Sequence, residues 1–259
     1  MSKIEVLAVT MNRTTTDFLK HMNIANNVNV VVANQADRFE YSKEVSADKS
    51  IQFITHNTKG VGLNRNIALL NSKDEILVFA DDDIKYRDGA FDEIQKAFKK
   101  YPNADGFVFN INTIGQDMGR RANKKVKRVR IYNFLNYGAV RLVIKKDFLK
   151  KNGIFFSEMF GGGAKYGSGE DTLFIRECLK KKIKLYTYPI VIADVYQEDS
   201  TWFEGYNEKY FYDKGALMKE CFHNMYLFII VLYALKSSIN MNKKFKDIVH
   251  WMIKGAKEY

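Results

Sequence analysis

Short apolar runs alternate with amphipathic stretches along the first half of the chain. Runs such as "IEVLAV" and "VNVVVA" are apolar and rich in β-branched residues, which is typical of buried strands. Between them, apolar residues recur at the spacing of a helix with one buried face. Because strands that alternate with helices form βαβ units, the pattern predicts an α/β fold with a mostly parallel sheet. The expected strands lie at 4–9, 28–33, 51–56, 75–80 and 104–111, and the expected helices at 14–23, 62–72 and 89–102.

The second half of the chain is less regular. A glycine-rich loop, "MFGGGAKYGSGED" (159–171), runs into a helix with an acidic first turn and a basic last turn, which suits the helix dipole. From Gly205 onward the sequence is aromatic and helical, so we expect one domain at 1–202 and a helical C-terminal extension at 203–259. The other predicted elements are a strand at 138–144, helices at 145–153 and 170–182, and short strands at 183–189 and 191–197.

The composition suits a well-packed protein. The chain has 259 residues, 46% of them hydrophobic, which is enough for one large α/β core with a modest extension. Cys178 and Cys221 match neither a disulfide framework nor a zinc-ligand pattern, and we expect buried thiols in a reducing cytoplasm. No apolar run typical of a signal peptide is evident at the N-terminus. "MYLFIIVLYAL" (225–235) is shorter than the roughly 20 apolar residues that span a bilayer.

The net charge of +11 favours polyanionic partners, such as nucleic acid, an anionic membrane or a phosphate-bearing substrate. One basic stretch is "GRRANKKVKRVR" (119–130). It fits a solvated loop, a contact with anionic lipid or a phosphate-bearing acceptor, or a nucleic-acid-binding module. It lacks the interleaved aromatic residues of a base-stacking surface. The four histidines, at positions 21, 56, 223 and 250, have no metal-ligand spacing, and we expect them to be structural or exposed.

Three adjacent carboxylates end the predicted strand in "LVFADDDIKY" (77–86). Like charges at contact distance repel, and a divalent cation relieves the repulsion between Asp81, Asp82 and Asp83. Mg²⁺ and Mn²⁺ prefer oxygen ligands and often combine one or two carboxylates with substrate phosphates. Ligands of open α/β sheets sit outside the carboxyl ends of the strands, where these aspartates fall. The alternative is a solvated acidic turn before the next helix.

Two further motifs carry candidate chemistry. "GEDTLF" places Glu170 and Asp171 at a helix start after several glycines, which permit close backbone approach to a ligand. The alternative is an ordinary acidic first turn. "GVGLNRN" (60–66) places Arg65 where it could reach a diphosphate, and the alternative there is a surface arginine.

The order of these motifs resembles the family 2 glycosyltransferases, which have the A-type nucleotide-sugar transferase fold. The resemblance covers roughly residues 4–202 and is specific through the combination of motifs rather than through any one of them. It implies a Rossmann-like, mostly parallel mixed sheet flanked by helices. The segments that carry it are "AVTMNR", "VVANQAD", "NTKGVGLNRNIAL", "EILVFADDDI" and "GSGEDTLFIREC".

The resemblance implies transfer of a sugar, with inversion, from a nucleoside diphosphate sugar, for which we expect a UDP-linked donor. The expected acceptor is a hydroxyl of a glycan or a lipid-linked oligosaccharide in bacterial surface polysaccharide synthesis. Asp171 would be the catalytic base, and Glu170 would support the acceptor. Asp83 and Asp81 would hold Mn²⁺ or Mg²⁺, with Asp82 as the alternative ligand because the triplet leaves the register open.

The same resemblance implies a nucleotide pocket at the ends of the first strands. The sequence departs from the family pattern at two positions, one that contacts uracil and one that binds the metal. Asp37 stands near the place where many relatives have an acidic residue that contacts uracil. Gln197 stands where many have a histidine that binds the metal. The residues expected to bind the nucleotide sugar are Thr10, Arg13, Asn34, Gln35, Arg65, Asp81 and Asp82.

Other interpretations remain open at this point. A sugar nucleotidyltransferase of related fold would need a glycine-rich, arginine-containing loop after the first strand, but "TMNRTTTDF" has no glycine. A basic nucleic-acid-binding module is the rival from another class. The C-terminal segment 225–259 joins an apolar run to lysines, a combination that interfacial helices show, so a cytoplasmic protein with a peripheral helix on the inner face of the cell membrane is one expectation. The alternative is a helical cap on the domain or on a second subunit of a homodimer.

Overall fold

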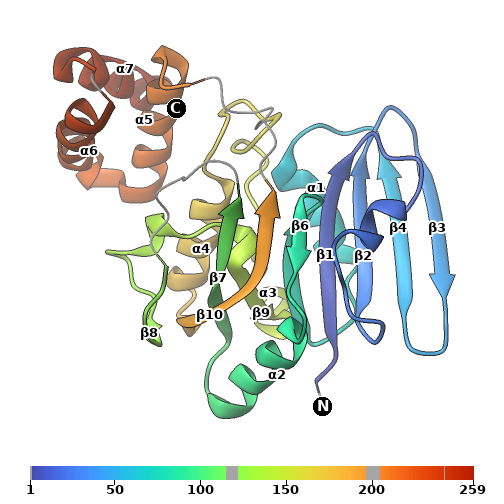
Figure 1. Cartoon of the computed structure of the whole chain (residues 1–259). Coiled ribbons are helices and arrows are strands. Elements are labelled where there is room, and N and C mark those ends of the chain that lie inside the picture. The colour runs from blue at the N-terminus through green and yellow to red at the C-terminus, as the bar shows by residue number, and fades with distance from the viewer. Residues whose placement is uncertain (1, 115–121, 197–204, 242) are drawn as a thin grey trace.

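The structure is a computed structural model that describes residues 2–114, 122–196, 205–241 and 243–259. Within these residues the strands are β1 (Ile4–Met11), β2 (Asn29–Gln35), β3 (Glu40–Val45), β4 (Ser50–His56), β5 (Ile76–Asp81), β6 (Ile84–Tyr86), β7 (Gly106–Ile114), β8 (Lys127–Arg128), β9 (Leu142–Lys145) and β10 (Leu185–Tyr196). They form one mixed sheet in the order β3-β4-β2-β1-β5-β9-β7-β10-β6, and β8 pairs with β10 (Figure 1). The expected mixed sheet of an α/β fold is confirmed.

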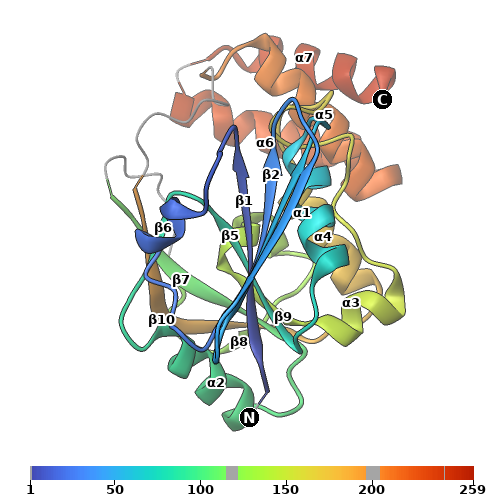
Figure 2. The same ribbon diagram turned by 90° about the vertical axis from the view of Figure 1, so that its right-hand side faces the viewer.

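Helices lie on both sides of this sheet (Figure 2). The α-helices are α1 (Val61–Asn71), α2 (Ala90–Lys100), α3 (Lys146–Asn152), α4 (Glu170–Lys180), α5 (Glu208–Phe222), α6 (Tyr226–Met241) and α7 (Phe245–Glu258). The 3₁₀ turns are η1 (Asp17–Lys20), η2 (Phe134–Asn136), η3 (Ala139–Arg141) and η4 (His223–Met225).

The alternating side chains of β1 supply two apolar layers, because successive residues of a strand point to opposite faces. Val6 and Ala8 belong to the layer that includes α2 and η1. Leu7 and Val9 belong to the layer that includes residues of α1, α3, α4 and α5. The sheet is therefore covered on both faces, as its near-continuous apolar strands require.

The register of the parallel strands brings predicted site residues to one edge of the sheet. β1 pairs in parallel with both β2 and β5, so the carboxyl ends of all three strands point the same way. Thr10 lies opposite Asn34, and Val9 lies opposite Asp81. The fold therefore positions the ends of β1, β2 and β5 as one platform.

Several elements differ from the sequence prediction. The helix expected at 14–23 is only the short turn η1, and the strands expected at 183–189 and 191–197 are one strand, β10. The pairing of β10 with β7 shifts register between Thr187 and Val191, on either side of Pro189, which cannot donate a ladder hydrogen bond. The edge strand β3 was not predicted because all six of its residues are exposed, so it lacks a buried face.

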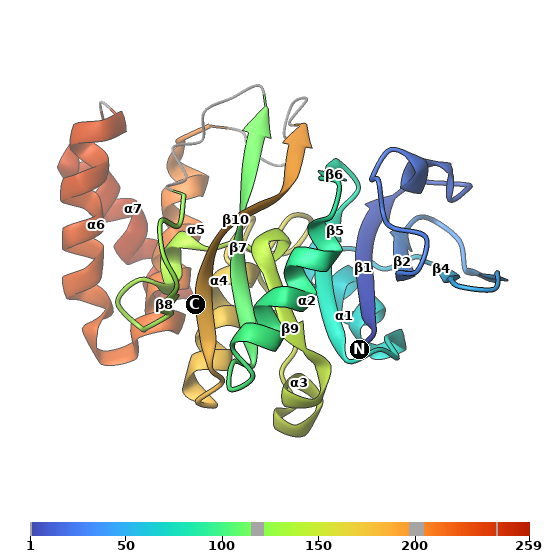
Figure 3. The ribbon, with the colours of Figure 1, turned by 60° about the horizontal axis from the view of Figure 1, so that its bottom comes forward.

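The first helix of the predicted C-terminal extension is part of the main core. Ala216, Leu217 and Cys221 of α5 belong to the same apolar cluster as Phe174 and Cys178 of α4. Both cysteines are free and buried, as expected. The helices α6 and α7 pack with α5 through a separate cluster, at the end of the molecule opposite β3 and β4 (Figure 3).

One helical stretch in the described residues, Glu208–Met241, has the length and apolar composition of a membrane-crossing helix. It consists of α5, η4 and α6, and the backbone turns at His223, where φ is 38°. The two α-helices have 15 and 16 residues, fewer than the roughly 20 that span a bilayer. Since α5 also packs in the core, length and composition alone are weak support for a membrane span.

Candidate active site

The three adjacent aspartates at the end of β5 have different partners. Asp81 accepts a hydrogen bond from the Arg65 guanidinium group at 2.9 Å. Asp82 accepts one from the Thr10 hydroxyl at 2.5 Å and another from the Arg13 guanidinium group at 3.0 Å. In the part of the chain that the structure describes, the Asp83 carboxylate forms no ion pair with a basic side chain. The three adjacent carboxylates therefore differ in their partners: Asp81 contacts Arg65, Asp82 contacts Thr10 and Arg13, and Asp83 has no basic partner among the described residues.

Asp83 is the carboxylate of the triplet that is best suited to a metal ion. Loss of hydration, followed by the charges of Asp81 and Asp82, raises the pKa of Asp83 to about 6, although the residue keeps contact with solvent. No group of three or more His, Cys, Asp or Glu among the described residues could hold an ion by itself. The oxygen donors fit Mg²⁺ or Mn²⁺ only if a substrate phosphate completes the coordination, which is common for these ions. Gln197, expected beside the metal, lies outside the described residues.

The predicted nucleotide residues at the ends of β1 and β2 hold the loop that follows β1. Asn34 accepts the backbone N–H of Arg13 at 3.0 Å and donates to the Arg13 carbonyl oxygen at 2.8 Å. This bidentate contact fixes the loop so that the Arg13 guanidinium group reaches Asp82. Gln35 accepts the backbone N–H of Gly60 at 2.9 Å, next to the start of α1. Asp37 lies beyond them and is exposed.

Arg65 is a buried bridge rather than a surface arginine. Its side chain is 4% exposed, and its guanidinium group donates to Asp81 at 2.9 Å, to Glu170 at 3.0 Å and to Asp171 at 2.7 Å. The guanidinium group also lies 5.5 Å from the ring centroid of Phe156. Burial lowers the pKa of Arg65, but the charges of Asp171, Asp81 and Glu170 more than offset burial and raise the pKa above its usual value.

This bridge connects the two carboxylate motifs of the sequence. Asp81 ends β5, and Asp171 lies in the first turn of α4, yet both contact the same guanidinium group. Both terminal nitrogens of Arg65 donate to carboxylates, and the expectation that Arg65 reaches a diphosphate stays a prediction. Its buried Nε atom has no hydrogen-bond partner in the described structure. The sequence could not reveal this arrangement, because it depends on α1, β5 and α4 meeting at one point.

The glycine-rich loop brings Glu170 and Asp171 to this place. Gly161 and Gly169 have φ angles of +112° and +129°, which residues with a β-carbon rarely adopt. A β-carbon at Gly161 would lie 3.0 Å from the Glu170 carboxyl carbon, so the loop backbone approaches that side chain closely. Glu170 also accepts the backbone N–H of Gly169 at 3.0 Å.

Asn64, which the sequence analysis did not single out, and His56 stabilise the platform. Asn64 of α1 donates to the backbone oxygen of Thr10 at 3.0 Å and contacts His56 at 2.8 Å. His56 is buried and also contacts Thr58 at 2.7 Å, which agrees with a structural role. A surface hollow of about 570 Å³ lies elsewhere, beside Lys3 and Asp88, and none of the candidate site residues lines it.

The comparison with known families agrees with this geometry. Residues 10–158, more than half of the chain, match the family described as Glycosyl transferase family 2. The chain belongs to glycosyl transferase family 2. The match favours this family over the nucleotidyltransferase and nucleic-acid-binding alternatives. The matched part of this family 2 chain includes the aspartates after β5 and Arg65, whereas Glu170 and Asp171 follow it.

Solved structures of S. aureus TarS have a similar fold. The chain matches TarS 1–349 in complex with UDP-GlcNAc with a TM-score of 0.61 and 15% identity, over 84% of this chain and 66% of that chain. It matches TarS 1–349 alone with a TM-score of 0.59 and 14% identity, over 99% and 72%. It matches a third structure, that of S. aureus TarS, with a TM-score of 0.63 and 15% identity, over 91% of this chain and 43% of that chain. This family 2 chain therefore spans less than half of that TarS chain, and a search of curated proteins found no significant match.

Proposed function

We propose that the protein transfers a sugar from a nucleoside diphosphate sugar to an acceptor hydroxyl group, with inversion at the anomeric carbon. The observation that carries the proposal is the bridge formed by Arg65. It joins Asp81, at the edge of the nucleotide platform, to Asp171, the residue expected to act as the base. Solved TarS complexes hold UDP-GlcNAc and UDP, which supports a UDP-linked donor here.

The start of α4 is assigned to the acceptor side of the proposed site. Asp171 would accept the proton from the acceptor hydroxyl as its oxygen attacks the anomeric carbon, which is typically worth about 10²–10⁴-fold in rate. Glu170, whose carboxylate is held by Gly169 and Arg65, would orient the acceptor. Arg65 would hold both carboxylates in place through its ion pairs with them.

The donor side is assigned to the platform at the ends of the parallel strands. Thr10, Arg13, Asn34 and Asp82 form one connected set of hydrogen bonds there, which would receive the base and ribose. Asp83, with Asp81, would hold Mn²⁺ or Mg²⁺. When bound, such an ion offsets the negative charge that develops on the departing diphosphate.

The acceptor is proposed to be a glycan or lipid-linked oligosaccharide of a bacterial surface polysaccharide. A location on the inner face of the membrane would bring the enzyme to a lipid-linked acceptor. The outer side of α6 supports this location, because large apolar residues there are exposed and no acidic residue occurs from Cys221 to Lys246. The exposed apolar residues of α6 are Leu227, Phe228, Val231, Leu232, Leu235 and Ile239, and Met225 of η4 just before the helix is exposed as well.

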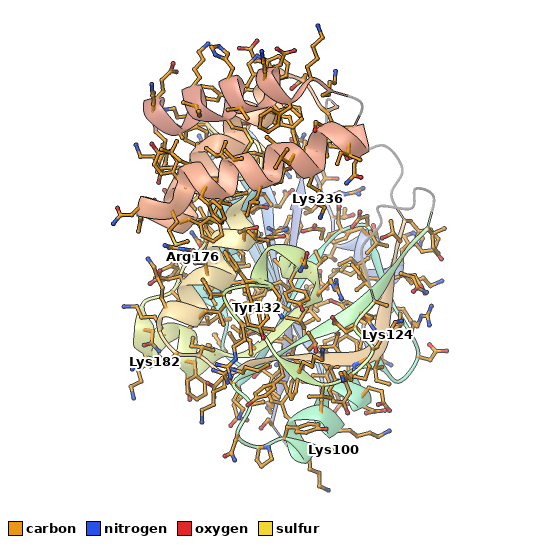
Figure 4. All side chains as sticks on the ribbon, turned by 90° about the vertical axis from the view of Figure 1, so that its left-hand side faces the viewer. Lys100, Lys124, Tyr132, Arg176, Lys182 and Lys236 are labelled. Atoms are coloured by element: carbon orange, nitrogen blue, oxygen red, sulfur yellow. The ribbon has the colours of Figure 1, made fainter. Side chains whose placement is uncertain are left out.

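The spread of lysines over the surface favours membrane contact, rather than binding of nucleic acid in a groove, as the role of the net positive charge. Lys100, Lys124, Lys182 and Lys236 lie apart from one another in the view of Figure 4, with Lys236 near the upper helices and Lys100 near the bottom. A nucleic-acid-binding groove would instead concentrate its cations along one track, beside aromatic residues. The basic segment 119–130 is described only from residue 122 onward.

The proposed reaction is tested with a panel of UDP-, GDP- and dTDP-linked sugars, each supplied with Mn²⁺ or with EDTA. The readout is release of the nucleoside diphosphate, with and without glycan acceptors. Release that requires Mn²⁺ and disappears in Asp83→Asn supports the donor assignment. Absence of release with every donor in the panel would contradict a transferase that uses these sugars.

A further inference from the structure

Helix α5 binds the last residues of the glycine-rich loop through two adjacent side chains. The Asp213 carboxylate accepts the backbone N–H of Gly167 at 2.8 Å. The Lys214 ammonium group donates to the Ser168 hydroxyl at 3.1 Å. Asp213 is 4% exposed, so this carboxylate is removed from water. A buried carboxylate requires such partners, because an unpaired one would carry a large desolvation cost.

A third side chain of α5 completes the contact. Lys209 forms an ion pair with Asp213 one helical turn away and donates to the backbone oxygen of Lys165 at 3.1 Å. The side chains of three α5 residues therefore contact loop positions 165, 167 and 168. The loop contributes the backbone N–H of Gly167, the backbone oxygen of Lys165 and the hydroxyl of Ser168. These contacts therefore define the path of the loop backbone.

The loop is also pressed against the helix at Gly169. A β-carbon at Gly169 would lie 2.8 Å from a methyl carbon of Leu217 on α5. Gly169 directly precedes Glu170, the first residue of α4. The backbone oxygen of Gly169 accepts the N–H of Leu173, and this hydrogen bond closes the first turn of the helix. The position of Gly169 therefore sets where the first turn of α4 begins, and that turn carries Asp171.

We propose that Asp213 and Lys214 are positioning residues that hold Gly167–Gly169 and thereby aim Asp171 at the acceptor hydroxyl. This inference rests on the proposed transfer reaction, in which Asp171 is the base. A general base must lie within about 2.6–3.2 Å of the proton-bearing atom. A displacement of about 1 Å from such geometry costs on the order of 10²-fold in rate. Helix α5 of the C-terminal extension thus positions the catalytic base and is not only a cap.

The two residues allow variants that separate positioning from folding. Asp213→Asn keeps an oxygen that can accept the Gly167 N–H, whereas Asp213→Ala removes it. Lys214→Met keeps the apolar stem and removes the ammonium group. Burial lowers the pKa of Lys214, and the Tm of the Met variant is measured so that a loss of positioning is separated from a loss of stability. Tyr233→Phe is the matched control, since it removes a 3.0 Å hydrogen bond to Tyr210 of α5, and Tyr233 forms no hydrogen bond with the described loop residues 165–169.

The experiment measures kcat, the donor Kd and Tm for all four variants. We expect Asp213→Ala and Lys214→Met to lower kcat by about tenfold or more, as for a misplaced base, while the donor Kd stays within about twofold. Asp213→Asn should restore kcat to within about threefold of wild type if the hydrogen bond to Gly167 is what matters. Equal kcat in Asp213→Ala and Tyr233→Phe, or an Asn variant as slow as the Ala variant, would overturn the proposal.

Amide hydrogen exchange tests the loop contact independently of activity. The Gly167 amide should exchange faster in Asp213→Ala than in wild type, and as slowly as wild type in Tyr233→Phe. If the wild-type protein transfers no sugar, the proposed function fails while this exchange result still stands. Unchanged exchange at Gly167 in Asp213→Ala would overturn the positioning contact even in an active enzyme.

Discussion

The carboxylates of Asp81 and Asp171 bind the same guanidinium group, although they come from the end of β5 and the start of α4. Arg65 donates to Asp81 at 2.9 Å and to Asp171 at 2.7 Å, and its own side chain is nearly fully buried. The donor side and the acceptor side of the proposed reaction therefore meet at one buried cation. Removal of that cation should affect both the fold and the chemistry.

Replacement of Arg65 by Met should destabilise the protein and abolish transfer. The substitution leaves Asp81, Glu170 and Asp171 without their shared cation, and loss of one partner from a buried ion pair costs about 3–5 kcal/mol. We expect about 3 kcal/mol, the low end of that range, because Asp81 and Asp171 keep partial contact with solvent. Urea unfolding of Arg65→Met and Arg65→Lys measures the change. An Arg65→Met variant as stable as wild type would show that the bridge is not structural.

Asp171→Asn should lower kcat by about 10²-fold or more, the usual scale for loss of a general base. Asparagine has nearly the same shape and keeps an oxygen for Arg65, so Tm should change little. Donor binding should also be retained, because the proposed reaction assigns Asp171 to the acceptor side. Equilibrium binding of UDP and steady-state kinetics separate the two effects. Loss of donor affinity with kcat preserved would contradict the assignment.

Asp83→Asn should stabilise the metal-free protein above pH 6 while it abolishes metal-dependent transfer. The pKa of Asp83 is raised to about 6 in the folded protein, so its ionisation opposes folding above that pH. In EDTA, the wild-type protein should therefore gain stability as the pH falls from about 6 toward the unfolded-state value. The gain should be only about 1 kcal/mol, because solvent screens this exposed carboxylate.

The matched variant for this measurement is Asp82→Asn. Asp82 accepts hydrogen bonds from Thr10 and Arg13, so its replacement should weaken donor binding without the pH-dependent gain in stability. Stability is followed by thermal melts in EDTA between pH 4.5 and 8. Parallel pH profiles for wild type and Asp83→Asn would show that Asp83 carries no such repulsion.

The parts of this arrangement that sequence analysis could predict are those with a local signal. The buried strands β1, β2, β4 and β5 have apolar runs, and the aspartates follow the last of them directly. The shared carboxyl edge then follows from the parallel strand order. The edge strand β3 has no buried face and hence no apolar pattern, so the pattern could not predict it.

The parts that could not be predicted depend on tertiary contacts. Arg65 looks the same in sequence whether it is exposed or bridges three carboxylates, since its burial depends on α4 packing beside α1. Asp213 and Lys214 stand in a helix with no recognisable motif, and only the path of the glycine-rich loop gives them a role. The boundary expected at residue 203 separated α5 from a core to which its Ala216 and Leu217 belong.

The exposed apolar side of α6 should bind anionic membranes. Phe228 and Leu232 lie about one helical turn apart and are 59% and 48% exposed, and Lys236 follows one turn later. Lys243, Lys244 and Lys246 are exposed just beyond the helix. Apolar side chains that enter the headgroup boundary, combined with nearby lysines, are typical of interfacial helices. Each basic residue near an anionic surface contributes about 1 kcal/mol.

Flotation with vesicles of phosphatidylglycerol and phosphatidylcholine, at 50 mM and 500 mM salt, measures this binding. We expect wild-type protein to float at low salt and to be released at high salt, because screening weakens the lysine contribution. Phe228→Glu with Leu232→Glu should abolish flotation and leave transfer to a soluble acceptor unchanged, since neither residue contacts the crevice. Glu208→Ala is the control variant. It changes a charged side chain on α5, away from the apolar side of α6, and flotation at low salt should be retained. A wild-type protein that stays unbound at low salt and sediments as a dimer, which the double variant converts to a monomer, would assign this side of α6 to a second copy of the chain instead.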